Sequence, residues 1–539
     1  MTEQQADLVV IGSGAAGLSA ALSAACAGGK VVLLEATDSI GGTTSLSGAM
    51  LWAPANRWQK AAGIEDSLET TRAYIARCLG PRAEDPRWEL FLARINPLID
   101  ELLVKECGLT FDLCGYPDSF GEWPEGRNSR HIVARPFPMK KLGEWKSRMR
   151  KPAIPGSGLM TLLSVEKVGW IAPTVPPTLF RLIPTIIGNL LMGRRAMGLG
   201  LVSAMTAACL RRGVRIETNA RVTGLLRDGD RVTGVTVEDN GTERSFRARR
   251  GVVLACGGFS SDSEACEAYL PGPYDLPQDP AVNMGDNLRL AREVGADLRS
   301  LDEAWYLPSS PLPTPYMGKP IGQTLVMDRM LPHQIWVNAA GNRFVNESGQ
   351  NAAEAFYAKD AGGRLPNYPC FSIFDQQYRD KYLIYLKHNG KSKGPDELVE
   401  ASTLEGLAQR IGVSASGLLA TVRRFNEMAR RGRDEDFGRG DGAYERYFTG
   451  AEGSLGTIEK GPFYALPVYS GGVGTKGGPM TDVHARVLRP DGSVVEGLYA
   501  AGNAAAAFNG PITVAAGCTI PPGLVMGNAA ALHAMGRPA

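Results

Sequence analysis

The sequence predicts an α/β fold built on a parallel β-sheet, and three observations support this prediction. Residues 7–12 (DLVVIG) form an uninterrupted apolar run of the kind found in central parallel strands. A glycine-rich turn and an Ala-rich helical stretch to about Ala27 follow directly. A second apolar run covers residues 30–34 and ends at Glu35. Strand, turn, helix and strand in this order are typical of a βαβ unit, in which the two strands are parallel.

The turn after the first strand reads GSGAAG over residues 12–17. Glycines at this spacing are typical of dinucleotide binding: Gly12 permits the tight turn, Gly14 lets the backbone approach a pyrophosphate, and Gly17 allows close helix–strand packing. The N-terminus of the following helix carries a partial positive charge that favours phosphate. Glu35 lies 21 residues after Gly14, in register to accept hydrogen bonds from ribose hydroxyls. We therefore predict a dinucleotide site.

The rest of the chain predicts a second region of mixed helix and strand. Residues 60–110 have helical patterns, whereas residues 111–160 are rich in Pro, Gly and aromatic residues and predict loops. A helix over residues 198–212 and a strand over 251–255 are expected to return to the first sheet. Beyond them we expect a strand over residues 334–338, helices near 402–432, and strands with glycine turns after residue 464.

Composition and charge exclude several classes of protein. The 58 Lys and Arg residues nearly balance the 56 Asp and Glu residues, so the sequence shows no basic footprint for nucleic acid. The nine cysteines form no CxxC pair, which removes the spacing argument for zinc, and no metal site is predicted. An odd cysteine count and an N-terminus without a basic region before its apolar run predict a reducing, cytoplasmic location.

The identity of the dinucleotide follows from motifs outside the first turn. The glycines at residues 438–442 (GRGDG) follow no apolar strand, so we interpret this segment as a surface loop and expect one nucleotide site. Residues 41–44 (GGTT) offer donors for a pyrophosphate that leads towards a flavin, and Gly502-Asn503 resembles a turn that holds a ribityl chain. These features predict FAD. Without an NAD(P)H module, an external acceptor must reoxidise it: a quinone, O2 or a redox protein.

Six segments resemble the flavoprotein family of fumarate reductases and 3-ketosteroid dehydrogenases: IGSGAAGLSAALSAA, GGTTSLSG, GVVLACGGF, DRMLPHQIWVNAAGNRFVNES, GTKGGPMTD and GLYAAGN. The resemblance implies a Rossmann-like FAD-binding domain (residues 1–280 and 465–539) with an inserted α+β catalytic domain (residues 281–464). The absence of His at Thr43 or Thr44 predicts that FAD is bound non-covalently.

The motifs and the resemblance together give the set of residues expected to bind FAD. Family precedent places Val222, Ala255 and Gly257 on the adenine side. The full set is Gly12, Ser13, Gly14, Ala15, Ala16, Gly17, Glu35, Ala36, Gly41, Gly42, Thr43, Thr44, Ser47, Gly48, Val222, Ala255, Gly257, Gly502, Asn503, Pro522 and Leu524.

The branch of the family can be chosen from the expected substrate-binding residues. Fumarate reductases carry a His-Thr-x-Gly-Gly motif, where this chain has Gly474 in place of His, and no Arg occurs between Arg489 and Arg537. A buried dicarboxylate without an Arg partner is strongly disfavoured. Residues 328–338 are instead similar to the Glu-Arg-x-Leu-Pro…Val-Asn run of 3-ketosteroid Δ1-dehydrogenases.

That similarity implies α,β-desaturation of a cyclic ketone, steroid-like or smaller. In this reaction a base removes the α-proton and the β-hydride passes to flavin N5. Gly517 matches the family glycine whose backbone N–H polarises the carbonyl, which stabilises developing enolate charge.

The catalytic residues depart from the family pattern. Three tyrosines of the Δ1-dehydrogenases are replaced here by Thr513, Asn351 and Ser119. We therefore expect Tyr116 or Tyr306 to act as the base, although the unperturbed pKa of a phenol is about 10 and each could merely make a core contact. Ser119 is expected to donate a hydrogen bond, and Thr513 to be a second donor to the carbonyl. Lys476 is expected to hold a turn near the flavin.

Two other functions remain open from the sequence: a flavin-dependent reductase of an activated alkene, and a non-catalytic flavin-binding or electron-relay protein. The apolar stretch over residues 176–192 favours a lipophilic ketone substrate. Arg181 and Pro184 interrupt it and it is short for a membrane span. We expect it to be buried or to line a pocket, with peripheral contact to a membrane as the alternative.

Overall fold

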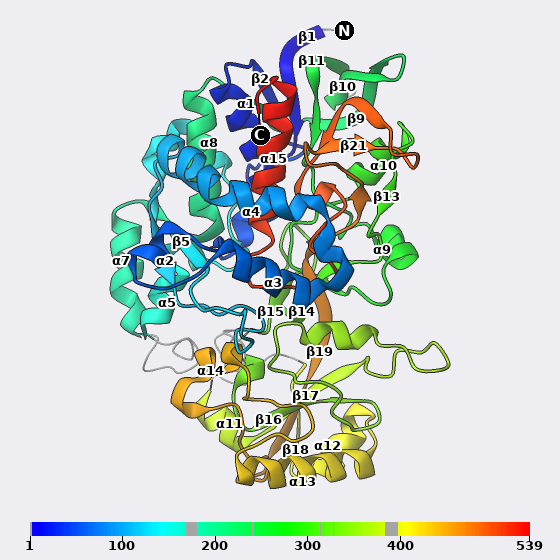
Figure 1. Ribbon diagram of the computed structural model, residues 1–539. Helices are drawn as coiled ribbons and strands as arrows, with labels where there is room; N and C mark the ends of the chain where they lie inside the picture. The colour runs from blue at the N-terminus through cyan, green and yellow to red at the C-terminus, as the bar shows by residue number, and fades with distance from the viewer. Residues whose placement is uncertain are drawn as a thin grey trace.

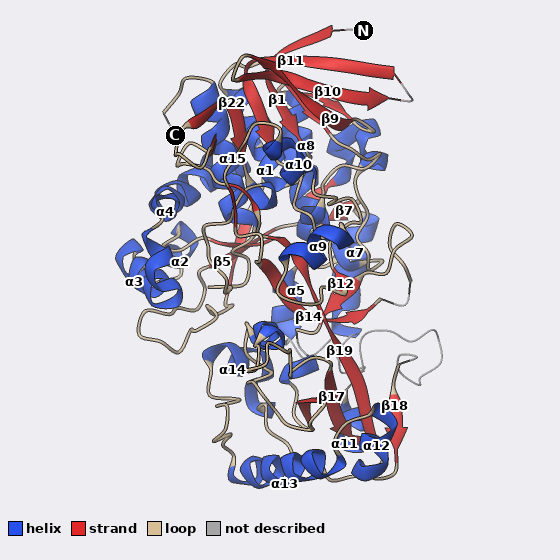
Figure 2. Cartoon of the chain, turned by 90° about the vertical axis from the view of Figure 1, so that its right-hand side faces the viewer, coloured by secondary structure: helices blue, strands red, loops and turns tan. Residues whose placement is uncertain are grey.

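The computed structural model describes residues 3–168, 180–239, 242–312, 314–326, 328–382 and 397–538. The chain forms an upper lobe around one sheet and a lower lobe around another (Figure 1). Both ends of the described chain lie in the upper lobe, as Figure 2 also shows. All nine cysteines lie in the described residues and none forms a disulfide.

The upper lobe contains the predicted parallel sheet. Its central strand β1 (Glu3–Ile11) pairs in parallel with β2 (Val31–Leu34) and with β11 (Thr242–Leu254). Two further strands extend the parallel core, β8 (Arg215–Glu217) beside β2 and β22 (Val494–Ala500) beside β11. The antiparallel strands β9 (Arg221–Asp228), β10 (Arg231–Asp239) and β21 (Arg486–Leu488) complete the eight-stranded sheet.

Helices from both ends of the sequence pack together beside this sheet. The helix α1 (Ala15–Cys26) lies against α15 (Ile520–Ala534), blue beside red in Figure 1. Both are apolar on every side, as expected for fully buried helices, and share one hydrophobic core with α4 (Pro86–Leu98) and α8 (Met197–Arg211). The C-terminal segment therefore completes the N-terminal unit.

The helical pattern over residues 60–110 is confirmed by α2 (Arg57–Ala61), α3 (Leu68–Leu79), α4 and η3 (Ile99–Glu106). The loop-rich segment that follows contributes β4 (Phe111–Cys114) and β5 (His131–Ala134). These two strands form a three-stranded antiparallel sheet with β3 (Met50–Trp52), in the order β3–β5–β4.

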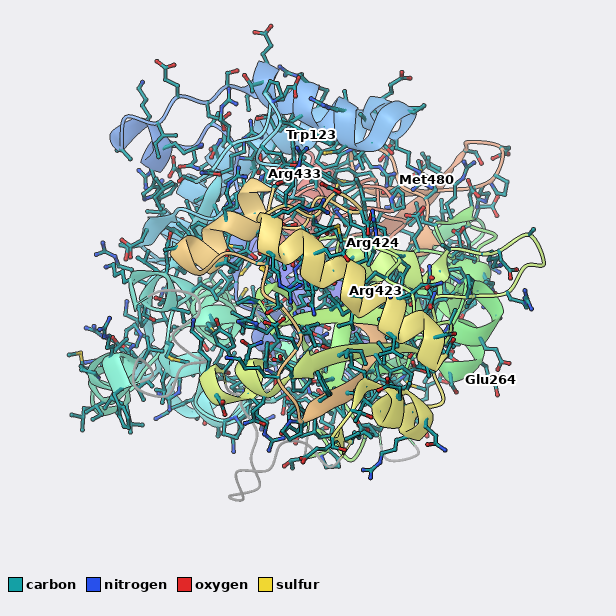
Figure 3. The ribbon with its side chains drawn as sticks, turned by 90° about the horizontal axis from the view of Figure 1, so that it is seen from below. Trp123, Glu264, Arg423, Arg424, Arg433 and Met480 are labelled. Atoms are coloured by element: carbon teal, nitrogen blue, oxygen red, sulfur yellow. The ribbon has the colours of Figure 1, made fainter. Side chains whose placement is uncertain are left out.

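The lower lobe is built on antiparallel pairs. The long strand β19 (Phe463–Thr475) pairs with β14 (Ala304–Pro311) and β17 (Cys370–Asp375), and β17 pairs with β16 (Gln334–Asn338). The predicted helices near residues 402–432 are α12 (Leu404–Ile411) and α13 (Ala415–Arg431). The apolar face of α13 packs on the sheet, and Arg423 and Arg424 lie on its outer side (Figure 3).

Shorter elements complete the described structure. They are α5 (Leu162–Val168), α7 (Ile183–Leu191), α9 (Ser263–Tyr269), α10 (Asp286–Arg292), α11 (Gln376–Lys381), α14 (Ala443–Thr449), β6 (Phe137–Pro138), β7 (Arg194–Arg195), β12 (Leu276–Pro277), β13 (Leu298–Arg299), β15 (Gly322–Thr324), β18 (Val399–Ala401) and β20 (Gly478–Pro479).

The expected domain boundary at residues 280 and 281 stays a prediction. Leu290 of α10 lies beyond that boundary and belongs to the same hydrophobic core as β1 and β10. The strand β13 pairs with β20, which also lies next to the C-terminal part of the first unit.

Two expectations about burial are corrected. The apolar helix α7 lies at the surface: Ile187, Leu190 and Leu191 are 49%, 54% and 80% exposed. The expectation that this stretch is buried or lines a pocket is therefore wrong for most of residues 180–192, of which only Leu182 and Asn189 are buried, while residues 176–179 lie outside the described residues. Residues 438–442 form the expected loop, but Arg439 within it is fully buried, because its guanidinium donates to the carbonyls of Gln334 and Leu331.

Candidate active site

A deep cavity opens where the parallel strands of the first sheet end. Ile11, Leu34, Ala255 and Ala501 stand at or just after the carboxyl ends of β1, β2, β11 and β22, and all four line it. Its empty space is about 1560 Å³, part of which is open to solvent. The carboxyl edge of a parallel sheet is the usual place for a nucleotide in this class of fold.

The glycine turn fits closely against the sheet. Gly12 has φ of +101°, and a Cβ there would lie 2.3 Å from the carbonyl oxygen of Ala255. A Cβ on Gly17 would lie 2.0 Å from the carbonyl oxygen of Gly12. Neither position can carry a side chain, so the N-terminus of α1 is held at the cavity wall, where its partial positive charge faces the ligand space.

Glu35 is fixed as an acceptor at the edge of the cavity. Ser13 Oγ donates to Glu35 Oε2 at 2.5 Å, and Thr37 Oγ1 donates to Glu35 Oε1 at 2.8 Å. The guanidinium of Arg150 lies 4.0 Å from the same carboxylate. The backbone N–H of Gly41 donates to Ser13 Oγ at 2.9 Å, which ties the second glycine motif to the first. The side chain of Glu35 is held in place before any ribose arrives.

Most of the residues expected to bind the cofactor line this cavity. They are Gly12, Ser13, Gly14, Ala15, Ala16, Glu35, Ala36, Gly42, Thr43, Thr44, Ser47, Gly48, Val222, Ala255, Gly257, Gly502 and Asn503. Gly17, Gly41, Pro522 and Leu524 are absent from the lining, and Leu524 accepts a hydrogen bond from Ser19 at its carbonyl instead.

Further lining residues were missed by sequence reasoning. Gln278 and Asn283 reach the cavity from the segment after β12, Thr324 reaches it from the end of β15, and no sequence motif marks them. Thr519 and Ile520 come from the start of α15, whose N-terminus is thus a second helix end at the cavity. This start could have been found from the Pro-Pro pair at residues 521–522, since Pro favours the first turn of a helix. Two helix N-termini, a fixed acid and exposed backbone donors fit a flavin dinucleotide.

The loop over residues 513–517 carries the donors expected at a substrate carbonyl. Gly517 has φ of +73°, and a Cβ there would lie 2.7 Å from the carbonyl oxygen of Met50. The N–H of Trp52 donates to the Gly517 carbonyl at 3.0 Å. Within the described residues, the N–H of Gly517 and the hydroxyl of Thr513 have no hydrogen-bond partner. Both donors are therefore free to bind a ligand.

The structure brings together the three positions at which tyrosine is replaced. Thr513 N–H donates to Asn351 Oδ1 at 2.7 Å, and Asn351 Nδ2 donates back to the Thr513 carbonyl at 3.2 Å. Ser119 Oγ donates to the same carbonyl at 2.6 Å. Ser119 and Asn351 thus hold the loop, and Ser119 uses its hydroxyl proton for this purpose.

Tyr116 and Tyr306 lie in packed aromatic surroundings. The hydroxyl of Tyr116 is 3.2 Å from that of Tyr444, and its ring centroid is 5.0 Å from that of Phe448. Burial raises the pKa of Tyr116 well above its usual value. Burial, and then the negative charge of Glu354, also raise the pKa of Tyr306. This packing favours the alternative that each phenol makes a core contact.

Two buried side chains, those of His131 and Lys476, contact backbone carbonyls within or just before the loop over residues 513–517. Nδ1 and Nε2 of His131 lie 2.8 Å from the carbonyl oxygens of Tyr116 and Ala516, and burial lowers the pKa of His131 to about 4. Lys476 Nζ donates to the carbonyls of Gly510 and Pro511 at 2.8 and 2.9 Å. The predicted role of Lys476 in holding a turn is confirmed, whereas no pattern in the sequence marked His131.

Lys476 also connects the loop to the cavity. Its ammonium lies 4.2 Å from the centroid of the Trp305 ring, and Trp305 Nε1 donates to Asn503 Oδ1 at 3.2 Å. Asn503 lines the cavity. Among the described residues, no cluster of His, Cys, Asp and Glu could hold a metal ion.

Comparison with known proteins gives extensive matches. The FAD binding domain family matches residues 7–520. The chain is 35% identical to a 3-oxosteroid 1-dehydrogenase of Mycobacterium tuberculosis, over 99% of both chains. It is 36% identical to a 4-oxocyclohexanecarboxylate 2-dehydrogenase of Sinomonas cyclohexanicum, over 97% of this chain and 91% of that protein.

Solved structures agree with these matches. The crystal structure of a 3-ketosteroid Δ1-dehydrogenase from Sterolibacterium denitrificans, in complex with 1,4-androstadiene-3,17-dione, superposes with a TM-score of 0.89 at 30% identity, covering 99% of this chain and 100% of that chain. A flavocytochrome c3 fumarate reductase superposes with a TM-score of 0.65 at 22% identity, covering 99% of this chain and 78% of that one. The second likeness is one of fold.

Proposed function

Because the chain belongs to the FAD-binding flavoprotein family of 3-ketosteroid dehydrogenases, we propose that it desaturates a cyclic ketone at the carbons α and β to the carbonyl. The family, the α/β fold class and FAD as the cofactor are confirmed by the same matches. Non-covalent attachment of FAD and a cytoplasmic location are further parts of this proposal.

The free N–H of Gly517 is the observation that carries the proposal. Removal of an α-proton develops negative charge on the carbonyl oxygen, and fixed donors that point at this oxygen stabilise it. Gly517 N–H and Thr513 Oγ1 belong to one loop, which leads directly into Thr519 and Ile520 at the cavity wall. When bound, FAD supplies the acceptor for the hydride that leaves the β-carbon.

The substrate is proposed as a chemical class. The relatives are named for a 3-oxosteroid and for 4-oxocyclohexanecarboxylate, which share a cyclic ketone. We infer that this chain also takes a lipophilic cyclic ketone, either a steroid or a smaller ring. Ser119, Asn351 and Thr513 are all smaller than the tyrosines they replace.

Reduction of an activated alkene is less well supported because two cationic candidates for its proton donor, His131 and Arg329, are already occupied by backbone carbonyls. Both ring nitrogens of His131 face backbone carbonyls. The guanidinium of Arg329 is occupied by the carbonyls of Leu325 and Glu347. Neither side chain is available to protonate a substrate.

Anaerobic mixing of the purified flavoprotein with cyclic ketones tests this function. We expect a saturated ketone to bleach the flavin absorbance and to be recovered as the enone. If no ketone bleaches the flavin, but enones reoxidise the dithionite-reduced protein, the activity is alkene reduction and our proposal is wrong.

We further propose that α7 contacts a membrane surface. Its exposed apolar residues lie between exposed cations: Arg181 precedes the helix and Arg194 follows it. Lys140 and Lys141, also exposed, follow β6, the strand that pairs with β7. An apolar helix face with a basic border is typical of peripheral binding to anionic lipid. None of the described helices is both long and apolar enough to cross a membrane.

The external electron acceptor is a quinone, O2 or a redox protein.

A further inference from the structure

Desaturation of a ketone requires a base, and the replaced tyrosine positions supply none. Ser119 and Thr513 carry hydroxyls, Asn351 carries an amide, and none of these groups accepts a proton readily at neutral pH. The hydroxyl of Tyr116 contacts that of Tyr444 inside an aromatic cluster, and burial raises the pKa of both Tyr116 and Tyr306. We therefore expect the base to be another residue near the loop over residues 513–517.

Glu354 lies close to this loop through a short chain of contacts. It belongs to the 3-10 helix η9 (Ala352–Tyr357), and its N–H donates to the Asn351 carbonyl at 3.1 Å. The side chain of Asn351 exchanges two hydrogen bonds with Thr513. The backbone of Glu354 is thus fixed relative to the loop that carries the two free donors.

The carboxylate of Glu354 is free, unlike the other acids around it. Its residue is partly exposed, and within the described residues its carboxylate has no hydrogen bond or ion pair. Glu303, by contrast, is paired with Arg82 at 2.5 Å. Glu347 is paired with Arg343 at 2.8 Å and with Arg439 at 3.1 Å. Of these three acids, only Glu354 has both oxygens unpaired, because Oε2 of Glu303 also lacks a hydrogen bond but is buried and its Oε1 is paired with Arg82.

The surroundings of Glu354 suit a base that works near neutral pH. Burial raises its pKa to about 7, the charge of Lys476 opposes this rise, and the charge of Glu303 adds to it. The phenols of Tyr306 and Tyr357 are the other titratable groups that it influences, and burial raises the pKa of both. A catalytic base is most effective when its pKa lies near the working pH.

Lys476 interacts both with Glu354 and with the segment just before Thr513. Its ammonium is held by the carbonyls of Gly510 and Pro511, just before Thr513, and its charge acts on Glu354. The same buried lysine therefore fixes the loop that binds the carbonyl and favours the ionised form of Glu354.

We propose that Glu354 is the general base of the desaturation, an inference that rests on the proposed function. The carboxylate removes the α-proton, whose C–H bond breaks to give the new C=C bond as the β-hydride passes to FAD. The ketone is oxidised by two electrons, FAD is reduced, and the proton stays on Glu354 until it passes to solvent. The external acceptor then reoxidises the flavin.

Anaerobic single-turnover kinetics of Glu354→Gln tests this role. We expect the rate of flavin reduction by a ketone to fall by about 10²–10⁴-fold, the usual contribution of a general base. The flavin spectrum is expected to stay that of the wild type. In D2O, exchange of the ketone α-proton, followed by NMR, is expected to be lost in parallel. Glu405→Gln, on the exposed face of α12, is the matched control and is expected to leave both rates unchanged.

The pH profile supplies a second readout. For the wild type we expect the rate of flavin reduction to rise with pH to a plateau, with an inflection near 7. Glu303→Gln removes a negative charge, so the inflection is expected to move to lower pH. Glu354→Asp keeps a carboxylate and is expected to retain part of the rate and a pH inflection, even where Glu354→Gln folds poorly.

The outcomes separate this inference from the proposed function. If a ketone reduces the wild-type flavin and both Glu354 variants react at the wild-type rate, the base is another group and the desaturase proposal stands. If no ketone reduces the wild-type flavin, both proposals fail. Loss of ketone reduction and α-proton exchange in Glu354→Gln, with the flavin still bound, supports both.

Discussion

Thr513 and Asn351 exchange a pair of hydrogen bonds across 162 residues of sequence. The N–H of Thr513 donates to Asn351 Oδ1 at 2.7 Å, and Asn351 Nδ2 donates to the Thr513 carbonyl at 3.2 Å. The backbone of Thr513 is thereby fully bonded while its hydroxyl stays free. This arrangement fixes the backbone that carries the hydroxyl, and a fixed backbone favours a preorganised donor to a carbonyl.

Replacing Thr513 tests that donor. We expect Thr513→Val to lower the rate of flavin reduction by a ketone about 10²-fold, since loss of one such donor typically costs 10²–10³-fold. Thr513→Ser keeps the hydroxyl and is expected to stay within a few-fold of the wild type. Stopped-flow absorbance measures both rates, and equal rates in the two variants would remove Thr513 from the site.

Gly517→Ala tests the backbone donor. The added Cβ would lie 2.7 Å from the Met50 carbonyl, so the loop must move and the N–H must leave its place. We expect a loss of about 10²-fold or more in flavin reduction, with FAD retained. Gly492→Ala is the matched control, because Gly492 has a φ of +82° with nothing within 4 Å of an added Cβ. In both variants a side chain at positive φ lowers the stability by about 1–2 kcal/mol. Only Gly517→Ala is expected to lose activity.

Gly12→Ala tests the cofactor site. A Cβ at Gly12 would clash with the Ala255 carbonyl at 2.3 Å, so the turn and the start of α1 are expected to shift. We predict purified protein with little or no bound flavin, measured by the absorbance ratio at the flavin and protein bands. Gly28→Ala, with φ of +88° and open space around it, is expected to keep its full flavin content. A fully loaded Gly12→Ala protein would place the phosphates elsewhere.

His131 predicts a dependence of stability on pH. Burial lowers its pKa from 6.5 to about 4, so the unfolded chain takes up a proton first as the pH falls. Stability contributed by the neutral ring is complete above pH 6.5 and is lost towards pH 4, by about 3 kcal/mol in total.

Urea unfolding of the wild type and of His131→Gln, at several pH values, measures this contribution. We expect the difference in unfolding free energy between the two proteins to shrink as the pH falls from 7.5 to 4.5. A constant difference would mean that His131 titrates normally in the folded state.

The exposed face of α7 predicts binding to lipid vesicles. We expect the protein to cosediment with vesicles of anionic phosphatidylglycerol and much less with phosphatidylcholine. Leu190→Ser and Leu191→Ser together are expected to weaken binding by at least about tenfold, because burial of one leucine contributes about 1.5–3 kcal/mol. Equal binding by the double variant would show that α7 makes no contact with the lipid.

The nucleotide-binding half could be predicted because its signal is contiguous. Strand, turn, helix and acid follow one another within residues 7–35, so local pattern alone fixes their arrangement. Gln278 and Asn283 reach the same cavity from the segment after β12, and only the packed structure shows this.

The catalytic side was harder to predict because its residues are far apart in the chain. The resemblance to the family marked Ser119, Asn351 and Thr513 as replaced positions but could not show that their side chains and backbone are joined by hydrogen bonds. That the carboxylate of Glu354 is unpaired is shown only by the folded structure, in which the neighbouring acids Glu303 and Glu347 form ion pairs. The apolar content of α7 was equally uninformative, since composition does not say whether a helix faces the core or the solvent.

The contribution of β22 and α15 to the FAD cavity affects how the protein is made. The strand β22 (Val494–Ala500) and the helix α15 (Ile520–Ala534) leave the ribosome long after the glycine turn that follows β1. Ala501, Asn503 and Ile520 form part of the cavity wall. The nascent chain can shape the glycine turn early, but it cannot enclose the flavin until β22 and the start of α15 have been made. Loading of the cofactor therefore has to wait for these two elements, and riboflavin shortage would leave α15 packed against an empty site.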